Sequence, residues 1–164
     1  MKKLLTIAFC GVALISSYSV MSQSQGDIRV QVGGILGTEA ATDGVGFGLN
    51  FGAEYFVSDA ISVAPSYDMF FKEDVSNSFL GNYEYKLSSI NIDGRYYFSE
   101  GFYGLAGLSL ASVSIFGVTG NETGLNVGAG YNLAMGDALL LNLQGKYNTP
   151  LEQIVAQVGV AFSF

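Results

Sequence analysis

The chain contains no histidine and no tryptophan, and its single cysteine, Cys10, lies in an apolar segment near the N-terminus. Histidine is the usual general base of serine and cysteine hydrolases, so neither a Ser-His-Asp nor a Cys-His arrangement can be built from these residues. The usual ligands of a zinc site are missing for the same reason. The composition therefore predicts a protein that is not an enzyme and that binds no cofactor.

Charged side chains are also scarce, at 13% of the 164 residues, where an average soluble domain has about 25%. The 7 basic and 14 acidic residues give a formal net charge of −7. A chain of this sign has no electrostatic attraction for a phosphate backbone, which argues against nucleic acid as a partner. The abundant residues are hydrophobic ones (49%), with 22 glycines, 12 phenylalanines and 10 tyrosines. This balance favours an all-β protein that faces lipid.

Residues 1–22 have the layout of a secretory signal peptide. Two lysines precede an apolar run over residues 4–15, and the small and polar residues SSYSVMSQSQ follow it. We predict cleavage after Ser22, which leaves residues 23–164 as the mature domain and removes Cys10 with the leader. The apolar run is shorter than the roughly 20 residues of a transmembrane helix, although an uncleaved anchor is the alternative interpretation.

The rest of the chain consists of segments in which apolar and polar residues alternate. In VGFGLNFGAEYFV, from Val45 to Val57, every odd-numbered residue is apolar, and glycine, asparagine or glutamate occupies most even-numbered positions. This period of two is typical of a β-strand with one apolar face. Eight such strands are expected, at about residues 27–37, 45–57, 61–72, 83–98, 102–116, 125–133, 139–147 and 153–164.

Two of these segments depart from simple alternation. In the fourth, Tyr83 and Leu87 have the opposite parity to Ile90, which predicts a β-bulge near Ser88. The fifth, residues 102–116, alternates poorly, and the sequence does not assign its two faces.

The connections between the segments alternate in length. Tight turns are expected at residues 58–59, 99–100 and 136–137, and longer polar links at residues 38–44, 73–82, 117–124 and 148–152. Short turns and longer loops in strict order predict an up-and-down antiparallel meander. A meander of eight strands closes into a barrel and so removes its exposed edges.

Alternation alone does not show which face of the barrel is apolar, because a soluble lipocalin-like barrel and a membrane barrel share this period. The polar face carries few charges and many glycine, alanine and serine residues, whereas a water-exposed surface has about 25–35% charged residues. Small residues suit the narrow bore of an eight-stranded barrel. Aromatic residues near the segment ends suit the boundary between lipid and water. We therefore predict an all-β, eight-stranded, antiparallel transmembrane β-barrel, with a soluble secreted binding barrel as the alternative.

Seven charged residues share the parity of the polar face, and we expect them in the lumen: Arg29, Glu54, Asp68, Lys72, Asp93, Arg95 and Lys146. Basic and acidic groups in one confined space predict an internal ion-pair network that neutralises buried charge and fills the bore. A catalytic pair of carboxylates and a gated pore are the alternatives for this cluster.

The last segment ends on QVGVAFSF, with larger apolar residues at alternate positions. Together with the signal peptide and eight strands, this ending resembles the small eight-stranded outer-membrane β-barrel family of Gram-negative bacteria (OmpA/OmpX-like). In that family the barrel-assembly machinery reads such an ending, ascribed here to Val158, Val160, Phe162 and Phe164, with Ile154 upstream. No second domain of the larger OmpA type is expected after the barrel.

The resemblance implies a location in the outer membrane, contact with outer-membrane lipids and lipopolysaccharide, and a monomer. It also implies a non-enzymatic integral membrane protein with a structural or surface-interaction role in the envelope. A narrow porin-like channel for small solutes is the alternative function.

We expect the exported protein to begin at Gln23 and to be recovered in the outer-membrane fraction, because the leader is removed and the apolar face needs lipid. Intact mass and membrane fractionation measure both. A soluble periplasmic or secreted pool would contradict the membrane assignment, and a mass that retains residues 1–22 would indicate an uncleaved anchor.

Overall fold

The computed structural model describes residues 23–39, 44–71, 73–77, 81–115 and 118–164. Within these ranges no helix is long and apolar enough to cross a membrane. The strands are β1 (Ile28–Glu39), β2 (Gly44–Ser58), β3 (Ile61–Phe70), β4 (Glu73–Asn77), β5 (Gly81–Tyr97), β6 (Phe102–Ile115), β7 (Val118–Ala134), β8 (Leu139–Asn148) and β9 (Gln153–Ser163).

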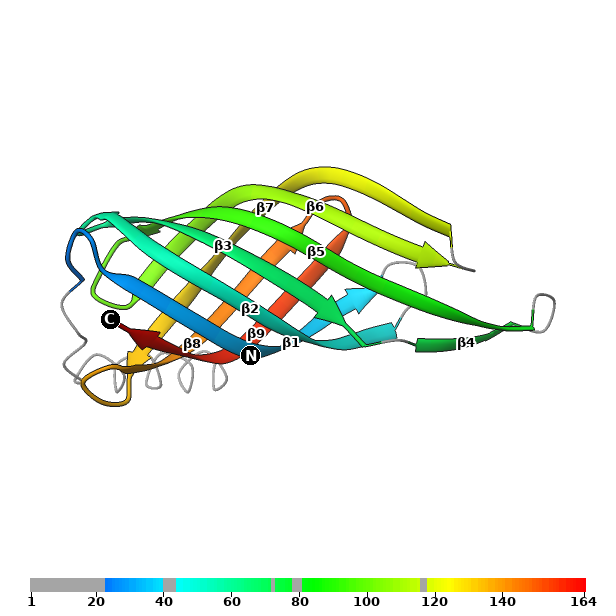
Figure 1. Cartoon of the computed structure of the whole chain (residues 1–164), viewed down its shortest axis with the longest axis horizontal. Coiled ribbons are helices and arrows are strands. Elements are labelled where there is room, and N and C mark those ends of the chain that lie inside the picture. Colours follow the sequence, from blue (N-terminus) through cyan, green and yellow to red (C-terminus); the bar gives the residue numbers. More distant parts are fainter. Residues whose placement is uncertain (1–22, 40–43, 72, 78–80, 116–117) are drawn as a thin grey trace, which may run out of the picture.

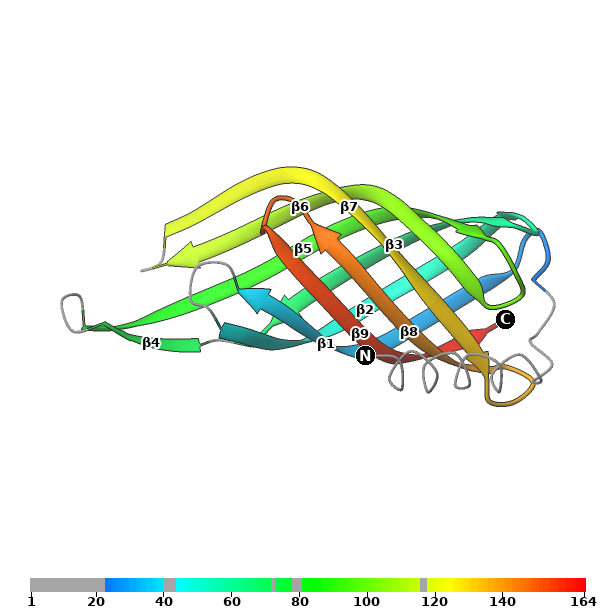
Figure 2. The ribbon, with the colours of Figure 1, turned by 180° about the vertical axis from the view of Figure 1, so that it is seen from behind.

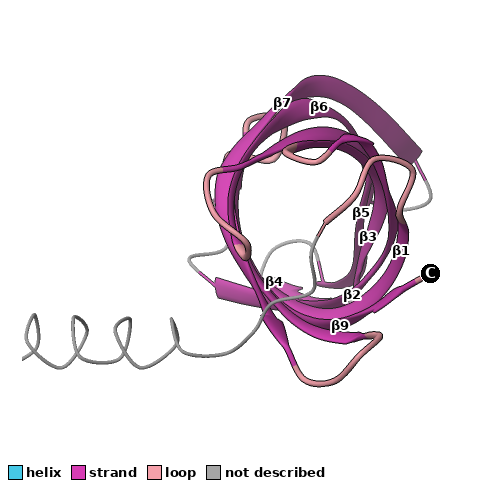
Figure 3. Cartoon of the chain, turned by 90° about the vertical axis from the view of Figure 1, so that its left-hand side faces the viewer, coloured by secondary structure: helices cyan, strands magenta, loops and turns pink. Residues whose placement is uncertain are grey.

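Eight of these strands form a closed antiparallel barrel (Figures 1 and 2). Each strand pairs with its neighbours in sequence, β3 pairs directly with β5, and β1 closes the ring against β9. β4 lies outside this ring as a short extension that pairs with the beginning of β5. Seen along its axis, the barrel is a continuous ring of strands (Figure 3). The prediction of an eight-stranded up-and-down β-barrel is confirmed.

The three tight turns lie at one end of the barrel, here called the turn end, and the longer connections lie at the other, the loop end (Figure 1). At the turn end, the side-chain amide of Gln23 donates to the carbonyl of Glu100, 3.2 Å away, and the amide of Phe164 donates to Ile28. Both ends of residues 23–164 are therefore at the turn end.

Burial alternates with a period of two along the strands, and it is inverted relative to a soluble protein. In β9 the outward Ile154 and Val158 are 59% and 57% exposed, whereas the inward Gln153 and Gln157 are buried. The same pattern recurs on the other strands, so that a band of exposed valine, isoleucine, leucine, phenylalanine and tyrosine surrounds the barrel. A continuous apolar surface of this extent is not stable in water.

The β-bulge predicted near Ser88 is wrong. β5 pairs with β6 in unbroken register from Tyr85 to Tyr97, and Leu87 has the inward parity because it belongs to an apolar cluster inside the barrel. The irregularity lies in the partner strand instead. Pairing with β5 stops at Met69, opposite Ser88, and resumes in β4 at Glu73, opposite Tyr85.

The structure also assigns the faces of the fifth predicted strand, β6. Tyr103 and Leu105 point inward and are buried, whereas Leu108 and Leu110 point outward. Alternation is weak in this segment because the apolar residues change face along the strand. Near the turn end the apolar pair Tyr103 and Leu105 points inward, and further along the apolar pair Leu108 and Leu110 points outward. The strand therefore changes its polarity pattern while its backbone stays regular.

Two of the predicted loops contain strand. Residues 73–77 form β4, and β7 begins at Val118, so that β6 and β7 form a ribbon beyond the first β7–β8 pair, Asn126 with Asn148 (Figure 1). We call residues 111–115 and 118–124 the loop-end ribbon. Its β7 residues from Val118 to Thr123 are exposed on both faces. A strand that is exposed on both sides has no apolar alternation, so the sequence pattern does not reveal it.

The seam between β1 and β9 depends on glycine at one close approach. Gly33 pairs with Gly159, and a Cβ on Gly33 would lie 2.8 Å from the carbonyl oxygen of Val158 and 2.9 Å from the Cα of Gly159. A Cβ on the adjacent Gly34 would meet nothing within 4 Å. The absence of a side chain at Gly33 therefore lets the two backbones approach each other.

We expect Gly33→Ala to lower the free energy of unfolding by about 1–3 kcal/mol, because the backbone across the seam must shift to admit the methyl group. Gly34→Ala is the matched control, and its effect should stay within about 0.5 kcal/mol. Urea unfolding of both variants in lipid vesicles measures the difference. Equal stability of the two variants would show that the seam tolerates a side chain at residue 33.

Candidate functional site: the polar interior of the barrel

Polar side chains from every strand of the barrel fill the lumen. Those buried to at least nine-tenths of their surface include Arg29, Gln31, Asn50, Glu54, Ser62, Asp68, Ser89, Asn91, Asp93, Arg95, Ser109, Asn126, Asn132, Asn142, Gln144, Lys146, Asn148, Gln153 and Gln157. The inward parity of each strand places them there, and many are amides, which can donate and accept at once.

Glu54 of β2 is the centre of the network in the half of the lumen near the turn end. Its carboxylate accepts hydrogen bonds from the hydroxyls of Ser62 (2.5 Å) and Tyr97 (2.6 Å). Arg95 of β5 forms an ion pair with it at 3.1 Å, and Arg29 of β1 lies 3.9 Å away. One carboxylate therefore connects four consecutive strands of the ring, β1, β2, β3 and β5.

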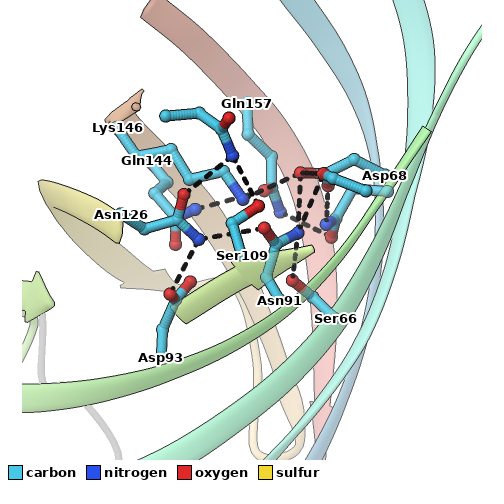
Figure 4. A network of polar contacts seen from close by, with 12 residues as sticks. Ser66, Asp68, Asn91, Asp93, Ser109, Asn126, Gln144, Lys146 and Gln157 are labelled. Carbon is cyan, nitrogen blue, oxygen red and sulfur yellow. Dashed lines mark hydrogen bonds and ion pairs between the residues drawn. The ribbon is translucent and has the colours of Figure 1, made fainter. Parts of the chain in front are cut away.

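Asp68 of β3 has the corresponding place in the half near the loop end (Figure 4). The ammonium group of Lys146 on β8 lies 2.8 Å from its carboxylate. The amides of Asn50 and Asn91 donate to the same carboxylate at 2.6 and 3.0 Å, and the hydroxyl of Ser89 donates at 3.3 Å. Each oxygen of this buried carboxylate therefore accepts at least one hydrogen bond.

Two amide side chains join these two centres. Arg95 donates to the Oε1 of Gln31 at 3.4 Å, and the Nε2 of Gln31 donates to the Oδ1 of Asn50 at 3.2 Å. Since Asn50 in turn donates to Asp68, an unbroken series of contacts runs from Glu54 to Asp68. Gln157 of β9 also donates to Asn50, at 3.1 Å.

Asp93 of β5 belongs to a third group that consists mainly of amides (Figure 4). Asn126 of β7 donates to it at 3.0 Å, and Asn148 of β8 donates to Asn126 at 2.9 Å and to the hydroxyl of Ser109 at 2.7 Å. These contacts connect three neighbouring strands with β5. Asp93 therefore extends the network to the wall formed by β6, β7 and β8.

The charges that the structure describes in the lumen balance. Arg29, Arg95 and Lys146 are buried together with Glu54, Asp68 and Asp93, which gives three positive and three negative groups. Removing one charged group from a buried pair costs more than the pair itself contributes, because the remaining charge is left without compensation. Neutrality is therefore a condition for the stability of this buried network.

Two apolar clusters close the ends of the polar network. The turn-end cap consists of Phe56, Tyr97, Tyr103 and Leu105, and the loop-end cap of Ile35, Phe70, Leu87 and Val155. At the turn end the guanidinium groups lie over aromatic rings, Arg29 at 4.5 Å from Phe56 and Arg95 at 4.8 Å from Tyr103. A ring face attracts a cation, which compensates buried guanidinium nitrogens that lack a hydrogen-bond partner in the described part of the protein.

The sequence prediction named seven charged residues for the lumen, and the structure describes six of them inside it; Lys72 lies outside the described residues. The four residues ascribed to the assembly signal belong to the outward face of β9 and its end. Val158, Phe162 and Phe164 are exposed there, and Val160 is partly exposed.

Neither the two caps nor the bridging contacts of the amides follow from the sequence pattern, although the alternation does place several of the amides on the inward face. Phe56 was detectable as the apolar exception among the even-numbered residues of β2. Asn50, Gln31 and Gln157 carry no charge, so their pattern resembles that of ordinary polar positions. Their role follows from contacts between strands far apart in sequence.

Solved structures of outer-membrane proteins have the same fold as this chain. Ail, the attachment invasion locus protein of Yersinia pestis, is 20% identical with a TM-score of 0.57, and the match covers 85% of this chain and 99% of Ail. The outer membrane protein OprG of Pseudomonas aeruginosa is 12% identical with a TM-score of 0.59, over 89% of this chain and 99% of OprG. Neisserial surface protein A is 20% identical with a TM-score of 0.56, over 85% and 96% of the two chains. No family model and no curated protein matches the chain.

We expect Lys146→Met to lower the free energy of unfolding by about 3–5 kcal/mol, because it leaves the buried Asp68 carboxylate without its cation. Lys86→Met is the control, because the side chain of Lys86 is exposed, and it should change stability by no more than about 0.5 kcal/mol. Unfolding in urea measures both. A Lys146→Met protein as stable as the wild type would mean that the ion pair does not hold the interior together.

Proposed function

We propose that this chain, which has the fold of the small eight-stranded outer-membrane barrels, is an integral outer-membrane protein of a Gram-negative bacterium that does not conduct solutes. Its role is structural or lies in surface interaction, and it is not an enzyme. The observation that carries this proposal is the lumen, where a charge-balanced polar network is closed at both ends by apolar caps.

The outer surface supports the membrane location. Isoleucine, valine, leucine and phenylalanine side chains are exposed around the whole barrel, and lipid is the solvent that stabilises such a surface. Tyr67 and Tyr147, outward and exposed towards the loop end, suit the boundary between hydrocarbon and water. Export through the predicted signal peptide would place the turn end in the periplasm and the loop end outside.

The filled lumen argues against the porin-like alternative. Conduction through an eight-stranded barrel requires a continuous water path, and the bore of such a barrel is narrow enough for side chains to fill. Here the ion pair between Lys146 of β8 and Asp68 of β3 joins opposite strands of the ring across the bore, and a cap lies on each side of it. With the interior occupied, the loop end remains as the part that can meet other molecules.

The loop-end ribbon supports a surface-interaction role. Between Val118 and Gly124, β7 pairs with β6 on one edge, and no other strand of the described ranges pairs with its second edge. Such an edge presents free N–H and C=O groups that an extended partner segment can pair with. A role in attachment, which the name of Ail states for that protein, belongs to the same class of function.

We expect the folded wild-type protein to show no steady conductance in a planar bilayer. Arg95→Ala with Tyr103→Ala, which removes the central guanidinium and part of the turn-end cap, should produce measurable openings. Phe102→Ala, an outward-facing change next to Tyr103, is the control and should stay silent. Steady conductance in the wild type would contradict the proposal and favour a pore.

A further inference from the structure

The outward face of the barrel carries little positive charge. Three of the basic residues that the structure describes are buried in the lumen, and Lys86 is the one whose side chain is exposed. It lies on the outward face of β5 and pairs across the strand boundary with Ser114 of β6. On a protein with a formal charge of −7, this exposed cation, the one found among the described residues, marks a place where an anionic group can approach.

Lys86 lies beside an apolar groove in the barrel wall. The groove has a volume of about 360 Å³, and its lining consists of Tyr67, Met69, Phe70, Phe71, Lys86, Leu87 and Ser88. We call it the Lys86 groove. Phe70 and Leu87 also belong to the loop-end cap, so the lining of the groove includes side chains that close the lumen.

The interruption between β3 and β4 explains why the wall is grooved here. Pairing between β3 and β5 ends at Met69 with Ser88, and the amide of Phe71 donates to the carbonyl of Phe47 on β2, 2.7 Å away. The chain therefore stays hydrogen-bonded to β2 as far as Phe71, whereas its pairing with β5 has already ended at Met69. The wall between β3 and β5 has no ladder at this level.

The groove lies at the upper limit of the apolar band. On the turn-end side of Lys86, the outward residues of β5 are the exposed Ile90 and Ile92. On the neighbouring strand β6, the outward residues at its level are Ser112 and Ser114. A lysine at this boundary can keep its alkyl chain on apolar surface and its ammonium group among lipid headgroups.

We propose that the Lys86 groove binds lipid A of the outer leaflet, with a lipid A phosphate on the Lys86 ammonium group and an acyl chain against Met69 and Phe71. The charge of Lys86 selects the phosphate, and the apolar lining accepts the chain. The choice of lipid A over a glycerophospholipid rests on the proposed orientation, in which the loop end faces outside. The outer leaflet there consists of phosphorylated glycolipid.

Native mass spectrometry of the folded mature protein, titrated with bisphosphorylated lipid A in detergent, tests this site. Lys86→Gln should weaken binding about five-fold, the effect of one basic side chain near an anionic membrane surface. Lys86→Arg should retain binding because it keeps the charge. Electrophoretic separation of folded and unfolded chains confirms that each variant forms the barrel.

A second pair of variants tests the groove independently of its charge. Ser88→Leu adds apolar bulk inside the groove and should weaken lipid A binding, whereas Ala106→Leu adds the same group on the outward face of β6, away from the groove lining, and should not.

Unchanged lipid A binding by Lys86→Gln would overturn the proposal, and so would equal binding of phosphatidylglycerol or of dephosphorylated lipid A. If the wild-type protein inserts into the membrane and shows no conductance but does not bind lipid A, the lipid site is wrong and the proposed function stands. If the wild-type protein does not insert into the membrane, the proposed function is wrong.

Discussion

The structure depends on one geometric constraint, the width of an eight-stranded bore. A closed ring of this size leaves an interior that side chains can just fill, so inward side chains can reach strands that are not their neighbours. Asp68 of β3 thereby reaches Lys146 of β8 on the opposite wall, and Gln157 of β9 reaches Asn50 of β2 past β1. In a wider barrel the same side chains would be separated by water, and the network would not form.

The inversion of polarity follows from this closure. In the described strands, most backbone groups of the barrel wall pair with neighbouring strands, which is the condition for crossing lipid. The outward face is then free to be apolar, and the polar side chains collect in the lumen. There they must satisfy one another, because an unpaired buried polar group or charge is destabilising. Three basic groups, three acidic groups and a set of bridging amides meet most of that requirement, and the exceptions among the described side chains are nitrogens of Arg29 and Arg95 and the amide of Gln153.

The function that we propose lies outside the interior for the same reason. Buried polar side chains and the two caps occupy the lumen in the described part of the chain, and our proposal of a non-conducting, non-enzymatic protein rests on that. The features that the network leaves unused are at the loop end, namely the free edge of β7 and the Lys86 groove. Both arise where strands extend beyond the barrel or separate from each other. The β7 edge presents backbone N–H and C=O groups to a binding partner, and the groove presents apolar side chains and the ammonium group of Lys86.

The amino-acid sequence by itself determined the architecture, because a period of two over segments long enough to cross a bilayer is a local property of each strand. It also identified the parity of the charged residues, since parity needs only the position along one strand. It failed at Leu87 and Phe56, where apolar side chains face inward, and at residues 118–124, where a ribbon exposed on both faces has no apolar face.

Only the tertiary structure decided which groups meet. The amides that join Glu54 to Asp68 come from β1 and β2, and the Lys86 groove forms where β3 leaves β5. Contacts across a bore depend on the stagger of the strands around the ring. The stagger is set by how neighbouring strands pair, so it cannot be read from the sequence of one strand.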